Sequence, residues 1–283
     1  MFFYDGLIKL KMNILFEEKD VEILISTMNR DSLGFLVPMF TSFDYSKISI
    51  LVINQVQNET KLSSTNPNIR VINSSEKGLS KSRNLALEKA KGKILLISDD
   101  DVVFQKGFIE KIIDAYQKYP NAAIIKFSAL KPNSKPLNKN AVNSKSSLSI
   151  FDILNTSSFE ITLNKYHVDF EKHKFDENFG LGGIFEMGEE AVFLSDLKKD
   201  GKQLVFEPQI IVAHNTLTSS DKKDVLERYF ISGAIFTRVF RKKYIFWIFI
   251  KMFFDLKQKK IKMNNLKAIF SSAIKGHKMF QKI

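Results

Sequence analysis

The sequence predicts an α/β fold with a mostly parallel sheet and crossover helices, followed by a basic helical tail. Short apolar runs alternate with helical patterns between residues 21 and 213, as in βαβ units. Polar residues follow several of these runs. Residues 1–220 carry 27 Lys/Arg and 27 Asp/Glu, whereas residues 221–283 carry 16 and 4, so the net charge of +12 belongs entirely to the tail.

Apolar runs in the first hundred residues predict four strands. They are too short for helices and rich in Ile, Leu and Val, and they lie at Val21–Ser26, Ile48–Ile53, Ile69–Asn73 and Lys93–Ser98. Polar residues close three of them, at Thr27–Arg30, Asn54–Gln55 and Asp99–Asp101. Because the carboxyl ends of parallel strands share one edge of a sheet, we expect these residues to line a single cleft.

Helical patterns lie between and after these strands. We expect helices at Leu33–Phe43, at Gly107–Tyr119 before Pro120, and from Gly188 to Asp200. A further helix should begin at Ser80 as N-cap and end at Gly92 as C′ glycine.

The second half of the domain adds four shorter strands and a polar loop. The strands are expected at Ala122–Leu130, Ser157–Asn164, Gln203–Glu207 and Gln209–Ala213, the last two on either side of Pro208. Residues 131–149 are rich in Lys, Asn, Ser and Pro, which predicts a loop. This loop is either a lid over the cleft expected at the strand ends or a plain connector.

Three consecutive carboxylates, Asp99, Asp100 and Asp101, follow the fourth strand. They repel one another, and a bound Mg²⁺ or Mn²⁺ would relieve the repulsion because these ions prefer oxygen ligands. If the chain stays extended, Asp99 and Asp101 point the same way and Asp100 the other. The alternative is a solvated acidic turn.

Two later features also carry chemistry. Phe175–Gly183 contains three glycines within four residues, and Glu189 and Glu190 then open a helix. The helix dipole alone could explain these two carboxylates, but the glycines would let a substrate approach the backbone. His214 ends a strand, where it is either a structural hydrogen-bonding residue or a ligand.

Composition excludes several classes of protein. The absence of cysteine excludes disulfides and thiolate metal sites and suggests a reducing compartment. The first residues lack the basic region of a secretory signal, so none is predicted. A pI of about 9.5 suggests nucleic-acid binding, but the charge is confined to the tail and no binding signature is present. We therefore expect no nucleic-acid partner.

Over residues 20–216 the sequence resembles the family 2 glycosyltransferases of the GT-A fold. The resemblance rests on four motifs in order: Ser26–Arg30, Gly78–Asn84, Ser98–Val102 as the Asp-x-Asp motif, and Phe175–Gly183 followed by Gly188–Glu190 and His214. It implies a catalytic domain at 1–220 with a helical region at 221–283.

The resemblance also implies roles for individual residues. Thr27, Asn29 and Arg30 would hold the base and ribose, and Arg83 would lie near the diphosphate. The Asp-x-Asp pair would place Asp99 near the ribose or metal and Asp101 on the metal, with Asp100 among the donor-binding residues and His214 closing the metal site. Glu190 matches the general base, although Glu189 could take that role. Asn54 stands where an aspartate usually reads the base, which weakens the assignment of uracil.

The implied function is metal-dependent, inverting transfer of a sugar from a nucleotide sugar, with UDP as the expected nucleotide. The acceptor would be a glycan or a lipid-linked molecule in bacterial surface polysaccharide synthesis. Two other readings remain: a nucleotidyltransferase of similar form, which would release pyrophosphate, and a non-catalytic membrane-associated scaffold.

The tail contains an aromatic segment, Tyr244–Phe254, between basic residues. It is about half the roughly 20 residues needed to span a bilayer, so we expect it to lie in the interface of an anionic membrane. The enzyme would then be cytoplasmic and peripheral at the inner face of the cell membrane. Alternatively, Trp247 and its neighbours pack on the catalytic domain or form a homodimer contact.

Overall fold

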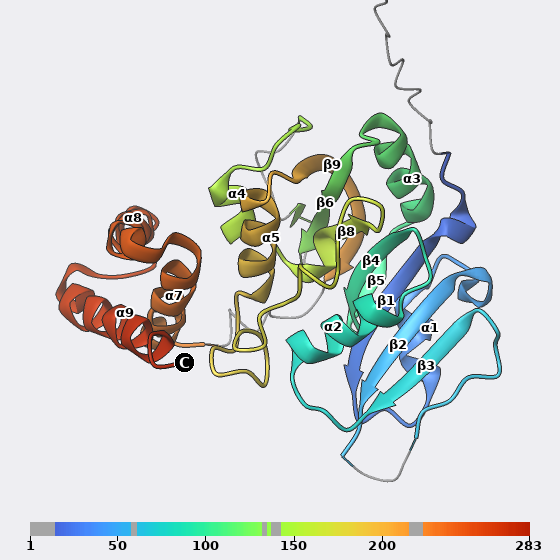
Figure 1. Ribbon diagram of the computed structural model, residues 1–283, viewed down its shortest axis with the longest axis horizontal. Helices are drawn as coiled ribbons and strands as arrows, with labels where there is room; N and C mark the ends of the chain where they lie inside the picture. The colour runs from blue at the N-terminus through green and yellow to red at the C-terminus, as the bar shows by residue number, and fades with distance from the viewer. Residues whose placement is uncertain (1–14, 58–60, 132–134, 137–142, 215–222) are drawn as a thin grey trace, which may run out of the picture.

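The computed structural model describes residues 15–57, 61–131, 135–136, 143–214 and 223–283. Within them the chain forms one sheet of nine strands in the order β3-β2-β1-β4-β8-β6-β9-β5, with β7 paired to β6 (Figure 1). The strands are β1 (Val21–Met28), β2 (Ser49–Gln55), β3 (Ile69–Ser74), β4 (Ile94–Asp99), β5 (Val102–Phe104), β6 (Ala122–Lys131), β7 (Lys135–Pro136), β8 (Ile161–Asn164) and β9 (Gln203–His214).

The predicted α/β architecture is confirmed. Strands β3, β2, β1 and β4 are all parallel, so their carboxyl ends meet at one edge. Strand β8 pairs antiparallel with both β4 and β6, and β6 pairs parallel with β9. The short β5 returns antiparallel along β9, at the far side of the sheet from β4.

Helices cover both faces of the sheet. They are α1 (Leu36–Met39), α2 (Leu79–Lys89), α3 (Phe108–Lys118), α4 (Ile150–Leu154), α5 (Glu189–Lys199), α7 (Val225–Phe240), α8 (Tyr244–Lys257) and α9 (Leu266–Phe280). Side chains of α1 and α3 form a buried core with one face of the sheet, and those of α2, α4 and α5 form a second core with the other. Both faces are therefore apolar, as expected for a parallel sheet.

The helix predicted at Leu33–Phe43 is much shorter than expected. A 3₁₀ turn at Leu33–Phe35 leads into α1, which ends at Met39. The polar residues that follow form a local turn, in which the Asp44 carboxylate accepts a hydrogen bond from the backbone N–H of Ser46. Local side-chain bonding of this kind competes with helix continuation.

Two strand predictions are also wrong in detail. Gln203–His214 is one continuous strand, and Pro208 lies where its register with β6 shifts, so its missing N–H breaks no regular ladder. The segment Ser157–Asn164 begins with a 3₁₀ turn, η4 (Ser158–Glu160), because the Glu160 side chain accepts a bond from the Ser157 N–H.

The ends of α2 differ from the prediction. Gly78, with φ of 127°, is the N-cap, and the buried Ser80 hydroxyl instead donates to the carbonyl of Phe179. Gly92 lies beyond the helix and packs against β1, where a Cβ would come within 2.6 Å of the Glu22 Cβ. Gly92 is therefore required for close packing, not for helix termination.

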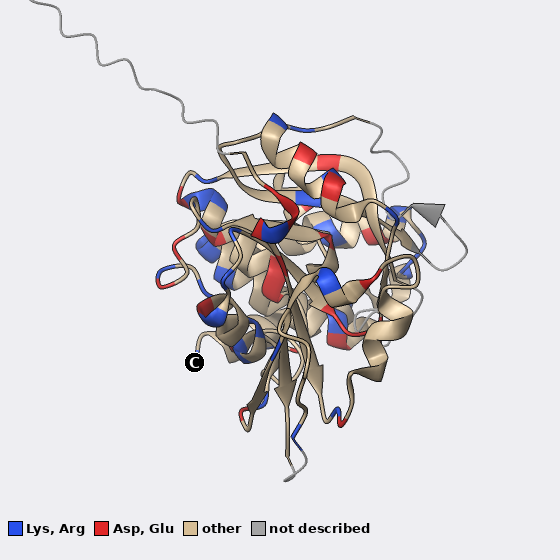
Figure 2. Ribbon diagram, turned by 90° about the vertical axis from the view of Figure 1, so that its right-hand side faces the viewer, with Lys and Arg blue, Asp and Glu red and all other residues tan. Residues whose placement is uncertain are grey.

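The loop predicted at residues 131–149 is described only in part, because residues 132–134 and 137–142 lie outside the described ranges. Its last residue, Ser149, caps α4 and accepts a hydrogen bond from the N–H of Asp152. Viewed from the sheet side, Lys/Arg and Asp/Glu are interspersed over the molecule, in keeping with the balanced charge of residues 1–220 (Figure 2).

Helices α7, α8 and α9 form a lobe beside α5 (Figure 1). The helices α7 and α9 cross closely, since a Cβ on Gly233 would lie 1.9 Å from the carbonyl oxygen of Ala273. Side chains of α7 and α9 share a core with Val192 of α5 and with Phe179 and Phe185. Helices α7 and α9 are thus packed against α5 and the segment around Phe179 and Phe185.

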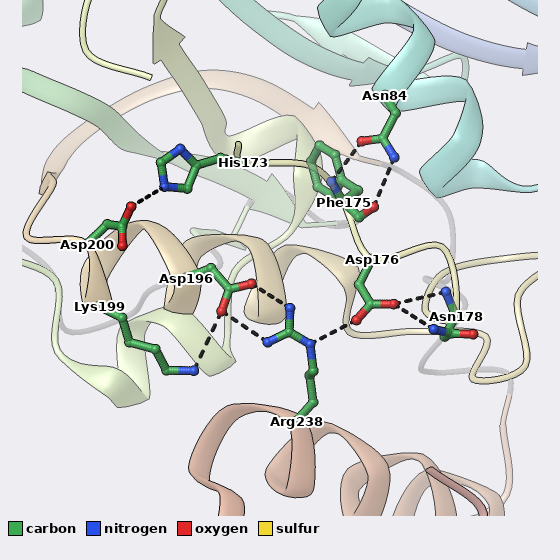
Figure 3. Close-up of polar contacts among 9 residues, drawn as sticks. All are labelled: Asn84, His173, Phe175, Asp176, Asn178, Asp196, Lys199, Asp200 and Arg238. Carbon is green, nitrogen blue, oxygen red and sulfur yellow. Dashed lines mark hydrogen bonds and ion pairs between the residues drawn. The ribbon is translucent and has the colours of Figure 1, made fainter. Parts of the chain in front are cut away.

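A cluster of ion pairs connects the lobe of α7, α8 and α9 to the rest of the chain. Arg238 of α7 reaches Asp196 of α5 at 2.7 Å and Asp176 of the glycine-rich segment at 2.9 Å (Figure 3). In the same view Asn84 of α2 holds the backbone of Phe175 through two hydrogen bonds of 2.7 and 2.9 Å. The glycine-rich segment is therefore attached both to α2 and to the C-terminal lobe.

Candidate active site

The three aspartates at the end of β4 contact different partners. Asp99 is the last residue of β4, and Asp100 and Asp101 form the turn that leads to β5. Because β5 pairs with β9 across the sheet, the chain changes direction here and is not extended. Each of the three carboxylates has its own partner: Arg83 for Asp99, Arg30 for Asp100 and His214 for Asp101.

Asp100 faces the loop after β1. Its Oδ2 accepts hydrogen bonds from the Thr27 hydroxyl and from Arg30, whose Nη2 lies at 2.7 Å. The Arg30 guanidinium also lies over the ring of Phe35, with its centre 5.3 Å from the ring centroid. Three residues expected to bind the nucleotide, Thr27, Arg30 and Asp100, are thus brought together at one strand edge.

Asn54 holds the loop after β1 through hydrogen bonds. It is fully buried, and its side-chain amide accepts from the Arg30 N–H at 3.1 Å and donates to the Arg30 carbonyl at 2.9 Å. It also donates to the side chain of Asn73. Asn29 has a positive φ of 53°, and its side chain accepts from the Gln57 N–H at 3.3 Å. Asn54 therefore holds the loop in place through the Arg30 backbone.

Asp99 takes part in a different cluster, centred on Arg83. The guanidinium is 2% exposed and contacts Asp99 at 3.0 Å, Glu189 at 2.9 Å and Glu190 at 3.0 Å. It also lies 5.6 Å from the centroid of the Phe175 ring. Arg83, expected beside the diphosphate, here joins the Asp-x-Asp motif to both candidate bases.

Charge in this cluster is unbalanced, with three carboxylates around one cation. Burial first, and then the charge of Glu189, raise the pKa of Glu190 to about 8, although Arg83 acts in the opposite direction. Burial alone would lower the pKa of Arg83, but Asp99, Glu190 and Glu189 together raise it above its usual value. Glu190 thus has a proton affinity suited to general base catalysis near neutral pH.

Asp101 lies beside His214, with its Oδ1 3.3 Å from the imidazole Nε2. The β5–β9 pairing explains this proximity, because Val102 is the register partner of His214. The His214 ring stacks on Phe159 with centroids 4.8 Å apart. Two of the three expected metal ligands are therefore adjacent, while Asp99 faces Arg83.

A carboxylate and an imidazole suit a divalent cation, and the diphosphate of a donor could supply further oxygens. Within the described ranges, however, no group of three or more His, Cys, Asp or Glu side chains is arranged to hold a metal ion. Asp101 and His214 thus fit part of a metal site.

Sequence reasoning missed the contribution of η4. Ser158 donates to the Asp99 Oδ2 at 3.0 Å, and the next residue, Phe159, is the ring stacked on His214. This single turn contacts both the Asp-x-Asp motif and the histidine. The Ser-Ser-Phe-Glu sequence resembles the start of a strand, and no signal in it indicates a functional role.

The glycine-rich segment brings the two glutamates to the cluster. The Leu79 N–H at the start of α2 donates to the Leu181 carbonyl at 2.8 Å. Gly182, with φ of 81°, passes so close that its Cβ would lie 3.2 Å from the Gly78 Cα. This close approach places the start of α5, with Glu189 and Glu190, beside Arg83 of α2.

The comparison with known proteins identifies the domain. The family model for Glycosyl transferase family 2 matches residues 50–170, which include β2–β4, the Arg83 helix and the aspartates. Residues 50–170 therefore match a family 2 glycosyltransferase domain. Among the curated proteins none matches this glycosyltransferase.

Solved structures resemble the glycosyltransferase in fold. The crystal structure of S. aureus TarS 1-349 has a TM-score of 0.57 and 14% identity, covering 89% of this chain and 80% of that one. The complex of TarS 1-349 with UDP-GlcNAc has a TM-score of 0.57 and 13% identity, covering 89% and 79%. The complex with UDP gives 0.53 and 14%, covering 77% and 64%. The likeness confirms the predicted GT-A fold.

Proposed function

We propose that this glycosyltransferase moves the sugar of a UDP-sugar to a hydroxyl group of a glycan or lipid-linked acceptor, with inversion at the anomeric carbon and release of UDP. The observation that carries the proposal is the Arg83 cluster, which joins a buried carboxylate of raised pKa, Glu190, to the Asp-x-Asp motif through Asp99. The binding of UDP and UDP-GlcNAc by TarS supports a uridine donor. We propose that the acceptor is an intermediate of bacterial surface polysaccharide synthesis.

Each group has a role in the proposed reaction. Arg30 and Thr27, held by Asp100 and Asn54, bind the nucleotide together with Asn29. Glu190 accepts the proton of the acceptor hydroxyl as its oxygen attacks the anomeric carbon, and the UDP oxygen departs on the opposite side. Because Arg83 touches both glutamates, it positions the base and stabilises its charged form.

Asp101 and His214 would hold a Mn²⁺ or Mg²⁺ ion, with Asp99 nearby at the end of β4. A divalent cation stabilises the negative charge that develops on the departing diphosphate. The same residues would then contribute to donor binding before any chemistry occurs.

We also propose that the C-terminal lobe attaches the enzyme to the inner face of the cell membrane. No helix in the described part of the chain has the length and apolar character needed to cross a bilayer. Trp247 packs inward, stacked on Phe240 at 4.1 Å and near Phe151 at 5.5 Å, so the expected packing on the protein accounts for this residue. Phe246 and Phe253, also on α8, are 63% and 62% exposed.

A screen of sugar nucleotides tests the proposal. The wild type should be stabilised in thermal unfolding by one UDP-sugar together with Mn²⁺, and that donor should yield UDP and a glycosylated product. Release of pyrophosphate would instead identify a nucleotidyltransferase. Absence of both donor binding and turnover across the screen would favour a non-catalytic scaffold.

A further inference from the structure

The C-terminal lobe contains a cavity that the proposed transfer reaction does not use. It lies where α7 ends, α8 begins and the last turns of α9 pass beside them. Its volume is about 440 Å³, and its lining residues are Thr237, Arg241, Lys242, Tyr244, His277 and Gln281. Two of these six side chains are basic, and none is acidic.

Positive charge is concentrated at this corner. Arg241, Lys242 and Lys243 form one 3₁₀ turn, η5, and all three are exposed. No carboxylate among the described residues lies within ion-pair distance of them, whereas Arg238, one turn earlier, is paired with two aspartates. Three adjacent cations repel one another, and a bound anion would relieve that repulsion.

The backbone conformation at the first of these cations is unusual. Arg241 has φ of 51° and ψ of −123°, a region that a residue with a side chain rarely adopts. The chain therefore holds a strained residue at the point where α7 gives way to η5. A glycine would relieve this strain, but it would remove a cation from the lining of the cavity.

Three other lining residues, Thr237, Tyr244 and His277, contact one another. The Thr237 hydroxyl donates to the Gly233 carbonyl at 2.6 Å, so it must accept from the Nδ1–H of His277, which lies at 2.9 Å. The imidazole also stacks on Tyr244, with centroids 3.8 Å apart. These contacts fix the His277 ring and the Tyr244 ring as two walls of the cavity.

The helix that begins at this cavity presents an apolar face to solvent. Ile248 and Met252 of α8 are buried, whereas other side chains of the helix are between 40% and 63% exposed, namely Ile245, Phe246, Phe249, Phe253 and Phe254. Phe151 of α4, itself 47% exposed, lies 6.0 Å from Phe254 between ring centroids and extends the face onto the catalytic domain. The basic cavity suits the phosphate group of a lipid, and the aromatic face of α8 beside it suits the hydrocarbon chains.

We propose that the cavity lined by Arg241 and Lys242 binds the phosphate group of an anionic membrane phospholipid, while the exposed aromatic face of α8 lies in the membrane interface. The inference rests on the proposed membrane attachment and gives it a specific binding site. Because Phe151 belongs to the same face, contact with lipid would also set the orientation of the catalytic domain towards the membrane.

Vesicle flotation with two matched double variants tests the site. R241Q/K242Q removes two charges from the cavity, and K257Q/K260Q removes two exposed charges from the other end of α8. On vesicles containing phosphatidylglycerol, the cavity variant should bind at least about tenfold more weakly than the control variant, because charged hydrogen bonds in a defined site exceed diffuse attraction. Vesicles of phosphatidylcholine alone should bind neither protein.

Trp247 is the only tryptophan and stands on α8, so it reports the position of this helix. Lipids with brominated acyl chains should quench its fluorescence in the wild type and in the control variant, and much less in R241Q/K242Q. Thermal unfolding and stabilisation by UDP-sugar should be the same in all three proteins. Loss of that donor response would be a failure of the catalytic proposal, not of the lipid site.

Three outcomes would overturn the inference. Equal weakening of both double variants would mean diffuse charge attraction without a site. If inorganic phosphate stabilises the wild type but not R241Q/K242Q, while vesicle binding is unchanged between them, the cavity takes a soluble phosphate. Dimerisation of the wild type through α8, with no vesicle binding, would assign the aromatic face to a second copy of the chain.

Discussion

Replacing Glu190 by Gln should make the protein more stable at alkaline pH and at the same time abolish most transfer. Gln has nearly the same size and can still accept a bond from the Arg83 Nη1, now 3.0 Å from the Glu190 Oε1. It removes only the ionisable group. The two effects have opposite sign, so a general loss of folding could not produce both.

The size of the effect follows from the pKa. The pKa of Glu190 rises from 4.5 to about 8 on folding, so the folded protein keeps a proton that the unfolded chain releases. The stability linked to this group is therefore fully present below pH 4.5 and is lost as the pH rises to about 8. A pKa shift of this size corresponds to about 5 kcal/mol in the free energy of unfolding, and part of this energy arises from the interaction of Glu190 with Glu189.

Urea unfolding at pH 5, 7 and 9 measures this loss. The wild type should lose several kcal/mol more than E190Q between pH 5 and 9. Transfer by E190Q should fall by roughly 10²–10⁴-fold, with little change in donor binding. In the wild type, kcat/KM should rise with pH, reach half its maximum near pH 8 and level off above it.

The matched control is E189Q, which removes the neighbouring charge that helps to raise the pKa of Glu190. Its pH–rate profile should shift to lower pH while transfer continues. If E190Q and the wild type show the same pH dependence of the free energy of unfolding, folding does not raise the pKa of Glu190. If E189Q rather than E190Q loses transfer, the base is Glu189.

Three further predictions concern the rest of the structure. R83Q leaves three carboxylates without their cation and should cost roughly 3–5 kcal/mol in urea unfolding at pH 8, and clearly less at pH 5; an unchanged stability would contradict the buried cluster. D101N should abolish Mn²⁺ binding in calorimetry and transfer in activity assays, as EDTA should in the wild type, and full activity in EDTA would exclude the metal role. G233A must separate α7 from Ala273 and should cost about 1–3 kcal/mol, whereas G34A, which meets only the Ser32 hydroxyl at 3.5 Å, should not.

Much of the fold follows from local sequence patterns. Runs such as Ile48–Ile53 are apolar and too short for helices, so they predict buried strands, and these strands are present. The position of the aspartates at the end of β4 and of Glu189 and Glu190 at the start of α5 also follows from the order of these patterns. Each such feature depends on residues within about ten positions of one another.

Contacts between residues far apart in the sequence could not be predicted in the same way. Arg83 meets Glu189 across 106 residues, and Arg30 meets Asp100 across 70. Both pairings depend on where the glycine-rich segment and β1 come to lie. The contacts of Ser158 with Asp99 and of Phe159 with His214 depend on η4, which no local pattern distinguishes from a strand.

The sequence by itself therefore determined an α/β domain of alternating strands and helices, its acidic strand end and its basic, aromatic tail, because periodicity and charge are properties of neighbouring residues. The tertiary structure decided which partner each carboxylate has. Strand β5 crosses to pair with β9, so the chain turns at Asp100 and sends Asp99 to Arg83, Asp100 to Arg30 and Asp101 to His214. That separation follows from long-range strand pairing, which three identical adjacent residues cannot encode locally.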